Sequence, residues 1–257
     1  MAVLVLPVPG LPRVQPGDDL PRLLATAIAE SRVGTKPGDV LLVCQKVVSK
    51  AEGRVVDLAD VEPSPFAAAW AARHDKDARV VELVLRESSR IVRMDAGHLI
   101  VETGPGWVCA NAGIDESNAV RDGQVTLLPL DADLSAERIR DGLRDHLGAE
   151  LGIVVTDTFG RPWREGQVEV ALGVAGLEPL LDLRGTRDLN GHELRVTVIG
   201  VADELAAAAG LVMGKAEGIA AVLVRGWQAP PLPANADPDR PRGGRALVRR
   251  RETDLFR

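Results

Sequence analysis

Two short apolar runs, each followed by polar residues, constrain the fold of this chain most. Residues 40–48 begin with VLLVC and are expected to form a mostly buried strand. The polar cluster at the end of this strand consists of Gln45, Lys46, Ser49 and Lys50. Residues 151–156 are expected to form a second strand that runs directly into Asp157. Both runs are far shorter than the roughly 20 apolar residues that span a bilayer. Each therefore predicts a buried strand with polar groups at its end.

Length and composition predict a globular cytoplasmic protein. A chain of 257 residues that is 46% hydrophobic can bury a core without disulfides or a structural metal. Cys44 and Cys109 lie far apart with no CxxC partner, which indicates neither a disulfide framework nor a zinc cluster. The N-terminus has no basic region before its apolar stretch and reaches Pro7 early, which is typical of a strand rather than a signal peptide. We expect no association with membranes.

The charge distribution argues against nucleic-acid binding and marks a separate C-terminal tail. A net charge of -6 leaves no general excess of Lys and Arg for contacts to phosphate backbones. Arginine is concentrated only in residues 240–251, among Pro and Gly, and this run is expected to be a solvated, mobile linker. We therefore expect a domain at residues 1–228 and a Pro/Arg-rich tail or linker at residues 229–257.

The remaining pattern mixes helices and strands without regular alternation. Helices are expected after Asp19, at residues 63–74 and 80–89, from an N-cap at Ser135 to Gly148, and at residues 203–210. Further strands are expected at residues 3–6, 99–103, 193–199 and 219–225. This order favours an α+β fold over a doubly wound parallel sheet.

No nucleotide-binding motif of the common kinds is present. Residues 210–216, GLVMGKA, are one residue too short between their glycines for a P-loop, and Ala216 stands where a hydroxyl should meet magnesium. The turn can still present backbone N–H groups to phosphate. A helix C-cap with a solvated Lys215 explains the same residues equally well.

Asp157 and Thr158 place a carboxylate and a hydroxyl on a rigid strand, the kind of oxygen ligands that magnesium and manganese use. Arg161 and Arg164 follow in a loop and suit the binding of phosphate or carboxylate groups. The alternative is an aspartate that caps a turn beside two solvated arginines.

A second acidic loop, NAGIDESNA, contains Asp115, Glu116 and Asn118. Asp115 could complete a metal site with Asp157, or the loop could be an ordinary Asx-rich turn. The four scattered histidines carry no catalytic signal.

Four segments together resemble one family. These are LPRV at residues 11–14, GDVLLVCQKVVSKAEGRVVDL at 38–58, NAGIDESN at 111–118 and TDTFGRPWREGQ at 156–167. The sequence resembles the coenzyme F420-0:L-glutamate ligases, represented by CofE in archaea and by the N-terminal domain of FbiB in actinobacteria. The later segments DLRGTRDLNGHELRVT and ADELAAAAGLVMGKAEGI fit it too, so the resemblance covers roughly residues 1–228.

The resemblance implies an enzyme that uses GTP to join L-glutamate to F420-0 and then adds further γ-linked glutamates. It implies a CofE-like α+β fold with mixed or antiparallel sheets, an intertwined homodimer, two Mn²⁺ or Mg²⁺ ions and K⁺ as a further ion. In fused members a flavin-dependent reductase domain follows a linker. A nucleotide-binding module without catalysis and a metal-dependent phosphohydrolase are the alternatives.

The residue roles follow from the matched motif positions. GTP contacts are implied for Leu11, Pro12, Arg13, Val14, Gln45, Lys50, Asn118, Met213, Gly214, Lys215 and Ala216. Asp115 and Asp157 are implied as ligands of one metal and Thr158 as a ligand of a second. Lys215 stands where some members carry a glutamine that helps to bind this second metal. Our own interpretation adds Arg161 and Arg164 beside Asp157 as anchors for F420-0.

Overall fold

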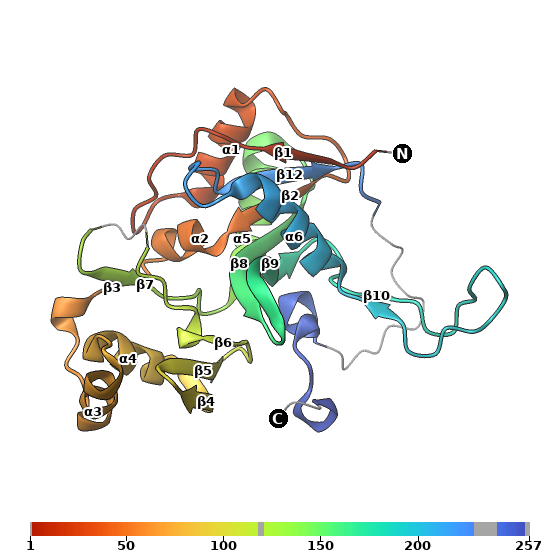
Figure 1. The fold of residues 1–257 in the computed structure, drawn as a ribbon. Helices are drawn as coiled ribbons and strands as arrows, with labels where there is room; N and C mark the ends of the chain where they lie inside the picture. The colour runs from red at the N-terminus through yellow and green to blue at the C-terminus, as the bar shows by residue number, and fades with distance from the viewer. Residues whose placement is uncertain (1, 118–120, 229–240, 255–257) are drawn as a thin grey trace.

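A mixed five-stranded sheet forms the centre of the molecule in a computed structural model that describes residues 2–117, 121–228 and 241–254 (Figure 1). Its order is β1–β12–β2–β8–β9. The strands are β1 (Leu4–Pro7), β12 (Ala221–Arg225), β2 (Val40–Cys44), β8 (Gly152–Arg161) and β9 (Arg164–Ala175). Only β2 and β8 run parallel, and the other neighbours are antiparallel. The expected α+β class with mixed sheets is confirmed.

Helices cover both faces of this sheet because its strands are apolar on both sides. Leu41 and Val43 point to the face covered by α1 (Leu20–Glu30) and α5 (Ala132–Leu147). Val40 and Leu42 point to the opposite face, which α6 (Val201–Met213) covers. Successive side chains of a strand alternate between faces, so a continuous apolar run fills two core layers.

Capping residues set the helix boundaries. Asp19 caps α1 by accepting a hydrogen bond from the backbone N–H of Arg22 at 3.1 Å, as its position before Pro21 predicts. The prediction that Ser135 caps α5 is wrong, because Asp131 accepts from the N–H groups of Asp133 and Leu134 and starts the helix one turn earlier. Gly148, with φ 64°, ends this helix as predicted.

A smaller α/β unit lies beside the lower end of the β8–β9 hairpin in Figure 1. It contains α3 (Pro65–His74), α4 (Ala78–Arg86) and the antiparallel sheet β4 (Ser88–Asp95), β5 (His98–Thr103) and β6 (Val108–Ala110). The ribbon β3 (Val55–Asp57) and β7 (Gln124–Thr126) leads into and out of it. Short 3₁₀ turns at Leu58–Asp60 and Asn111–Gly113 complete the segment.

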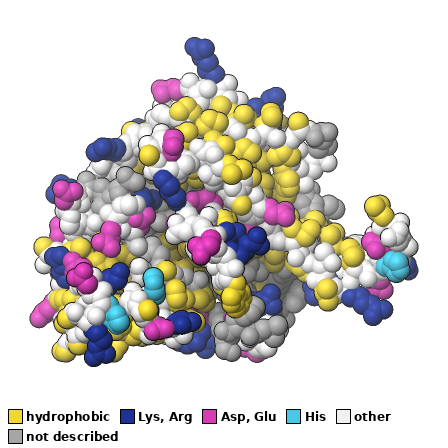
Figure 2. All heavy atoms as spheres, in the orientation of Figure 1, with side chains coloured by type: hydrophobic (Ala, Val, Ile, Leu, Met, Phe, Trp, Pro, Cys, Tyr) yellow, Lys and Arg dark blue, Asp and Glu magenta, His cyan; other side chains and the backbone are white. Residues whose placement is uncertain are grey.

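A long arm between β9 and α6 stands away from the body (Figures 1 and 2). Its base is the short antiparallel pair β10 (Leu181–Asp182) and β11 (Val198–Ile199). The prediction of a half-buried strand over residues 193–199 is wrong for most of its length, because no layer formed by the described residues covers the arm. Leu189 and Val196 are 106% and 87% exposed.

Two predicted strands have different bounds from those expected. β2 ends at Cys44, and residues 45–48 belong to α2 (Gln45–Ala51) instead, because this segment turns at the sheet edge and buries Gln45, Val48 and Ser49 on one helix face. The second strand does not stop before Asp157. It continues as β8 to Arg161 and turns at Pro162–Trp163 into β9, so the expected loop is a β-hairpin.

Part of the tail lies against the body. Residues 241–254 contain 3₁₀ turns at Gly243–Leu247 and Arg251–Thr253. The backbone N–H of Gly244 donates to Asp133 at 2.6 Å, and Arg251 lies 3.3 Å from Glu102. This part of the arginine-rich run is therefore bound rather than fully solvated. No helix in the described ranges is long and apolar enough to cross a membrane.

Candidate functional site

Four segments that are distant in sequence meet at one edge of the central sheet. The carboxyl ends of β1 and β2, the middle of β8 and the start of β12 all lie there, as the strand register requires. The backbone N–H of Val8 donates to Ala221 O, and that of Cys44 donates to Ala220 O, both at 2.9 Å. The sheet thus gathers residues 11–14, α2, Asp157 and the segment after α6 around one place. Ligands of open mixed and parallel sheets commonly bind at such an edge.

Two of the predicted GTP contacts, Arg13 and Lys50, form a cationic patch together with Lys46. Lys46 and Lys50 lie four residues apart on α2 and so share a helix face. Burial lowers the pKa of Lys50, and the positive charges of Lys46 and Arg13 lower it further. Arg13 is exposed. Such a group of cations suits a polyphosphate.

Gln45 offers a further polar group at the start of α2. Its Oε1 accepts a hydrogen bond from Ser49 Oγ at 2.9 Å, and its Nε2 is buried without a hydrogen-bond partner within the described residues. Buried amide donors are rarely left unpaired, so a bound group that reached this atom would gain a hydrogen bond from it.

Asp157 lies in the middle of the β8–β9 ribbon, opposite Val170. Burial raises the pKa of Asp157 to about 7; the backbone N–H of Thr158 opposes this, and the charges of Glu169 and Asp115 add to it. The carboxylate therefore lies where negative charge is concentrated and poorly solvated. A cation bound here would offset that charge.

Asp115 comes from the acidic loop, which β7 holds in place through a bridge between Asp115 and Thr126. Its Oδ2 lies 2.6 Å from Lys46 Nζ, and its Oδ1 accepts from the N–H of Ser117 at 2.6 Å. Burial would raise the pKa of Asp115, but the hydrogen bonds with Lys46 and Ser117 outweigh it and lower the pKa. Asn118, a predicted GTP contact, lies outside the described residues.

Thr158 points to the opposite face of β8 from Asp157, because neighbouring strand residues alternate. Its hydroxyl donates to Glu169 Oε1 at 2.5 Å and accepts a hydrogen bond from Lys215 Nζ. Lys215 follows the end of α6 at Met213 and Gly214, so the predicted segment at residues 213–216 does reach the sheet edge. Its lysine is in contact with the site rather than solvated alone.

Arg161 and Arg164 are not brought to Asp157. They lie opposite each other in the strand register at the exposed tip of the hairpin. Arg161 donates a hydrogen bond to the carbonyl of Glu165 at 2.8 Å. Arg161 is four residues from Asp157 along β8, which is about 13 Å at the usual rise of a strand. A substrate would have to extend along the β8–β9 ribbon to contact both Asp157 and the arginines at its tip.

The carboxylates of the site supply only part of the coordination shell of one divalent ion. Within the described ranges, no three His, Cys, Asp or Glu side chains come together as a complete metal site. Magnesium commonly takes one or two protein carboxylates and completes its shell with phosphate oxygens and water. Asp115 and Asp157 fit that pattern because Asp157 lies in excess negative charge. The hydroxyl of Thr158 is already engaged by an ammonium group.

The sequence analysis does not assign two polar residues of this site. Lys46 is predicted only as part of a polar cluster, although it makes the ion pair with Asp115. Glu169 was missed because β9 was not predicted. The alternation of Val168, Val170 and Leu172 around it is the signal that could have found both the strand and the face of Glu169.

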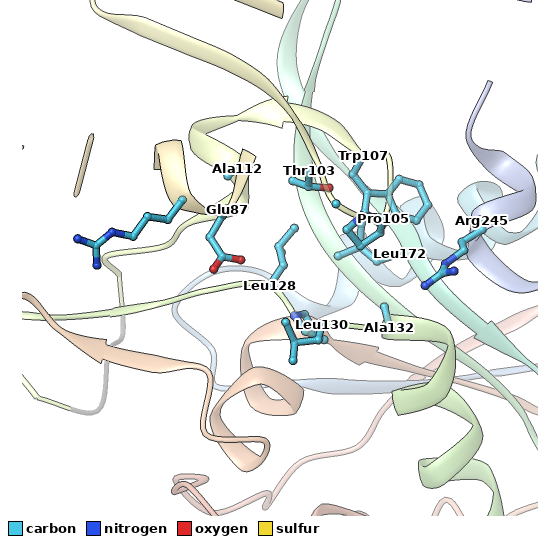
Figure 3. A pocket seen from close by; sticks show the side chains of 13 residues that line it. Glu87, Thr103, Pro105, Trp107, Ala112, Leu128, Leu130, Ala132, Leu172 and Arg245 are labelled. Atoms are coloured by element: carbon cyan, nitrogen blue, oxygen red, sulfur yellow. The ribbon is translucent and has the colours of Figure 1, made fainter. Parts of the chain in front are cut away.

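A separate pocket of about 420 Å³ lies between the body, the smaller unit and the tail. Figure 3 shows Trp107, Pro105 and Thr103 on one side, with Leu128 and Leu130 opposite. Glu87 and Arg245 add charges to the rim. The pocket borders the face of β9 that carries Leu172 and so lies on the same side of the ribbon as Asp157.

Comparison with known proteins gives a consistent result. Residues 10–226 match the family described as F420-0:Gamma-glutamyl ligase. The chain is 46% identical over 258 residues, all of both chains, to the coenzyme F420:L-glutamate ligase of Methanothermobacter thermautotrophicus. It is 48% identical over 252 residues to that of Methanopyrus kandleri, covering 98% of this chain and 96% of the relative. With the Archaeoglobus fulgidus protein of the same name the identity is 47% over 227 residues, 88% of each chain. The resemblance seen in the sequence is confirmed: the chain belongs to the F420-0:gamma-glutamyl ligase family.

Proposed function

We propose that this protein is a ligase that uses GTP to join L-glutamate to coenzyme F420-0 and then extends the product with γ-linked glutamates. Full-length similarity to proteins named coenzyme F420:L-glutamate ligase is the observation that carries the proposal. The gathering of four polar segments at one sheet edge supports it. A ligase of this kind needs cations for phosphate and carboxylates for metal within one site, and both are present there.

The proposed reaction proceeds through an acyl phosphate. The carboxylate of F420-0 attacks the γ-phosphorus of GTP, so a C–O–P linkage forms and GDP leaves. The amine of glutamate then attacks the acyl carbon, an amide forms, and phosphate departs with the bonding electron pair. A carboxylate alone is a poor acyl donor, and phosphorylation gives it a leaving group.

The residues of the sheet edge would share this work. Lys50, Lys46 and Arg13 would hold phosphate oxygens and fix the nucleotide in line with the carboxylate. Asp115 and Asp157 would hold Mn²⁺ or Mg²⁺, which supplies positive charge to the phosphates when bound. K⁺ and the preference for GTP stay predictions of the family resemblance.

A homodimer is also proposed, with a CofE-like intertwined arrangement. The arm around β10 and β11 exposes Leu189 and Val196 to solvent in a single chain. Apolar side chains on a projecting hairpin are unfavourable in water and would be covered by a second copy. Sedimentation equilibrium would give the mass of two chains if the proposal holds, and of one chain if it does not.

The deciding experiment incubates the protein with F420-0, L-glutamate, GTP and Mn²⁺ and follows the products by mass spectrometry. We expect F420-0 to gain one or more glutamyl residues while GDP and phosphate appear, and no product when GTP is omitted. Intact GTP binding without glutamyl product would indicate a nucleotide-binding module instead. Phosphate release without any amide product would indicate a phosphohydrolase.

Arg164→Ala tests the proposed anchoring of F420-0. Loss of a charged hydrogen bond is expected to raise the apparent KM for F420-0 about tenfold or more. The KM for GTP should stay within twofold, since Arg164 lies at the hairpin tip and away from α2. Arg138→Ala, at an exposed position on α5, is the matched control. An unchanged KM for F420-0 would remove Arg164 from the substrate site.

A further inference from the structure

A lysine ammonium occupies the place where the family resemblance puts a second metal ion. Lys215 Nζ donates to Thr158 Oγ1, the hydroxyl assigned to that ion. The same nitrogen lies 3.5 Å from Glu169 Oε1, and Thr158 donates to this oxygen at 2.5 Å. One positive charge therefore already lies against the hydroxyl that a second ion would use and beside the neighbouring carboxylate.

The backbone holds this arrangement in place. Glu169 is only 8% exposed, and α6 approaches it closely at Gly210, where an added Cβ would lie 2.7 Å from Glu169 Cγ. The turn at Gly214, with φ 59° and ψ −157°, then directs Lys215 back over β8. Glu169 Oε2 is buried without a hydrogen-bond partner within the described residues, so its carboxylate has few groups to balance its charge. The Lys215 ammonium supplies that balance.

We propose that Lys215 replaces the second divalent ion in this chain. A divalent ion bound to Thr158 Oγ1 would lie against the ammonium on the same oxygen, and the two like charges would repel strongly at that distance. A lysine can instead act as a point charge toward phosphate, as it does in other phosphate sites. The chain then holds one divalent ion, at Asp115 and Asp157. This inference rests on the metal site in the proposed function.

Counting bound manganese tests the inference without measuring catalysis. Metal-free protein is titrated with Mn²⁺ alone, and again in the presence of a non-hydrolysable GTP analogue, with free Mn²⁺ read by electron paramagnetic resonance. The variants are Lys215→Gln, which restores an oxygen ligand, and Lys215→Arg, which keeps the charge. Lys76→Gln, at an exposed lysine after α3, is the charge-matched control.

The wild type, Lys215→Arg and Lys76→Gln are each expected to bind one ion fewer per chain than Lys215→Gln. The spectrum of Lys215→Gln should also show the broadening of two spin-coupled Mn²⁺ ions. Equal counts in wild type and Lys215→Gln would overturn the inference while leaving the first metal site intact. Failure of every form to bind Mn²⁺ would overturn the Asp115–Asp157 site itself, and the inference with it.

Discussion

Asp157→Asn is expected to lower ligase turnover by a factor on the order of 10²–10³ or more while the protein still folds. The substitution keeps the size of the side chain and removes its charge. In the proposed reaction this charge holds a cation beside the phosphates, and no neighbouring side chain on β8 can replace it, since Thr158 points to the other face. Turnover is measured by the glutamyl-product assay, with Asp141→Asn on the exposed surface of α5 as control.

We also expect Asp157→Asn to change how the stability of the protein depends on pH, measured in EDTA so that no divalent metal is bound. The pKa of Asp157 is about 7 in the folded protein because of burial and neighbouring carboxylates, and it is near its ordinary value of 3.8 when unfolded. The stability that protonated Asp157 contributes is present below about pH 4 and is lost as pH rises through 7. The asparagine variant has no such loss, so its Tm should exceed that of the wild type at pH 8 and match it at pH 4. Near-normal turnover, or a lower Tm at pH 8, would contradict the role given to Asp157.

Arg225→Ala is expected to destabilise the fold by about 3–5 kcal/mol, because it leaves a buried carboxylate unpaired. Arg225 ends β12, and Asp39, whose side chain is 1% exposed, precedes β2. The two meet through Nε–Oδ1 at 3.0 Å and Nη2–Oδ2 at 2.7 Å. The pair therefore joins two central strands at the end of the sheet opposite the functional site. Urea unfolding followed by circular dichroism measures the loss.

Two comparisons separate this effect from a general loss of charge. Arg22→Ala breaks an exposed pair with Asp19, at 4.0 Å, and should change stability by less than about 0.5 kcal/mol. Asp39→Asn combined with Arg225→Ala should recover part of the loss, because the carboxylate is no longer charged. A loss below about 1 kcal/mol for Arg225→Ala would show that the pair is not important for stability.

Local signals in the sequence predicted the elements that depend on neighbours in the chain. Asp19 with Pro21 marked the start of α1, and Gly148 marked the end of α5. The predictions were wrong where residues distant in the sequence determine the local structure. The continuation of β8 past Asp157 depends on pairing with β9, and the turn after Cys44 depends on where the sheet ends. The periodicity of one segment predicts neither the strand pairing nor the position of the sheet edge.

In the candidate site, too, the sequence predicts some features and not others. Motif order placed Asp115, Asp157 and Lys50 in one family site, and the sheet does bring their segments to one edge. The contact of Lys215 with Thr158 and Glu169 could not be predicted from the sequence, because it depends on how closely α6 packs on β9. The prediction for the arm is wrong because an alternation of polar and apolar residues indicates a covered face but does not identify the layer that covers it.

The position of β12 has a consequence for biosynthesis. This strand is the last of the central sheet in the sequence, yet it lies between β1 and β2 and is the only strand that pairs with β1 in the part of the chain that the structure describes. While the growing chain ends before residue 221, β1 has nothing to pair with, and one edge of β2 exposes unpaired N–H and C=O groups. Closing the sheet then joins segments more than 200 residues apart, and contacts of such long range form slowly. A ribosome that stops before residue 225 should therefore release an unfolded, aggregation-prone chain rather than a partly active enzyme.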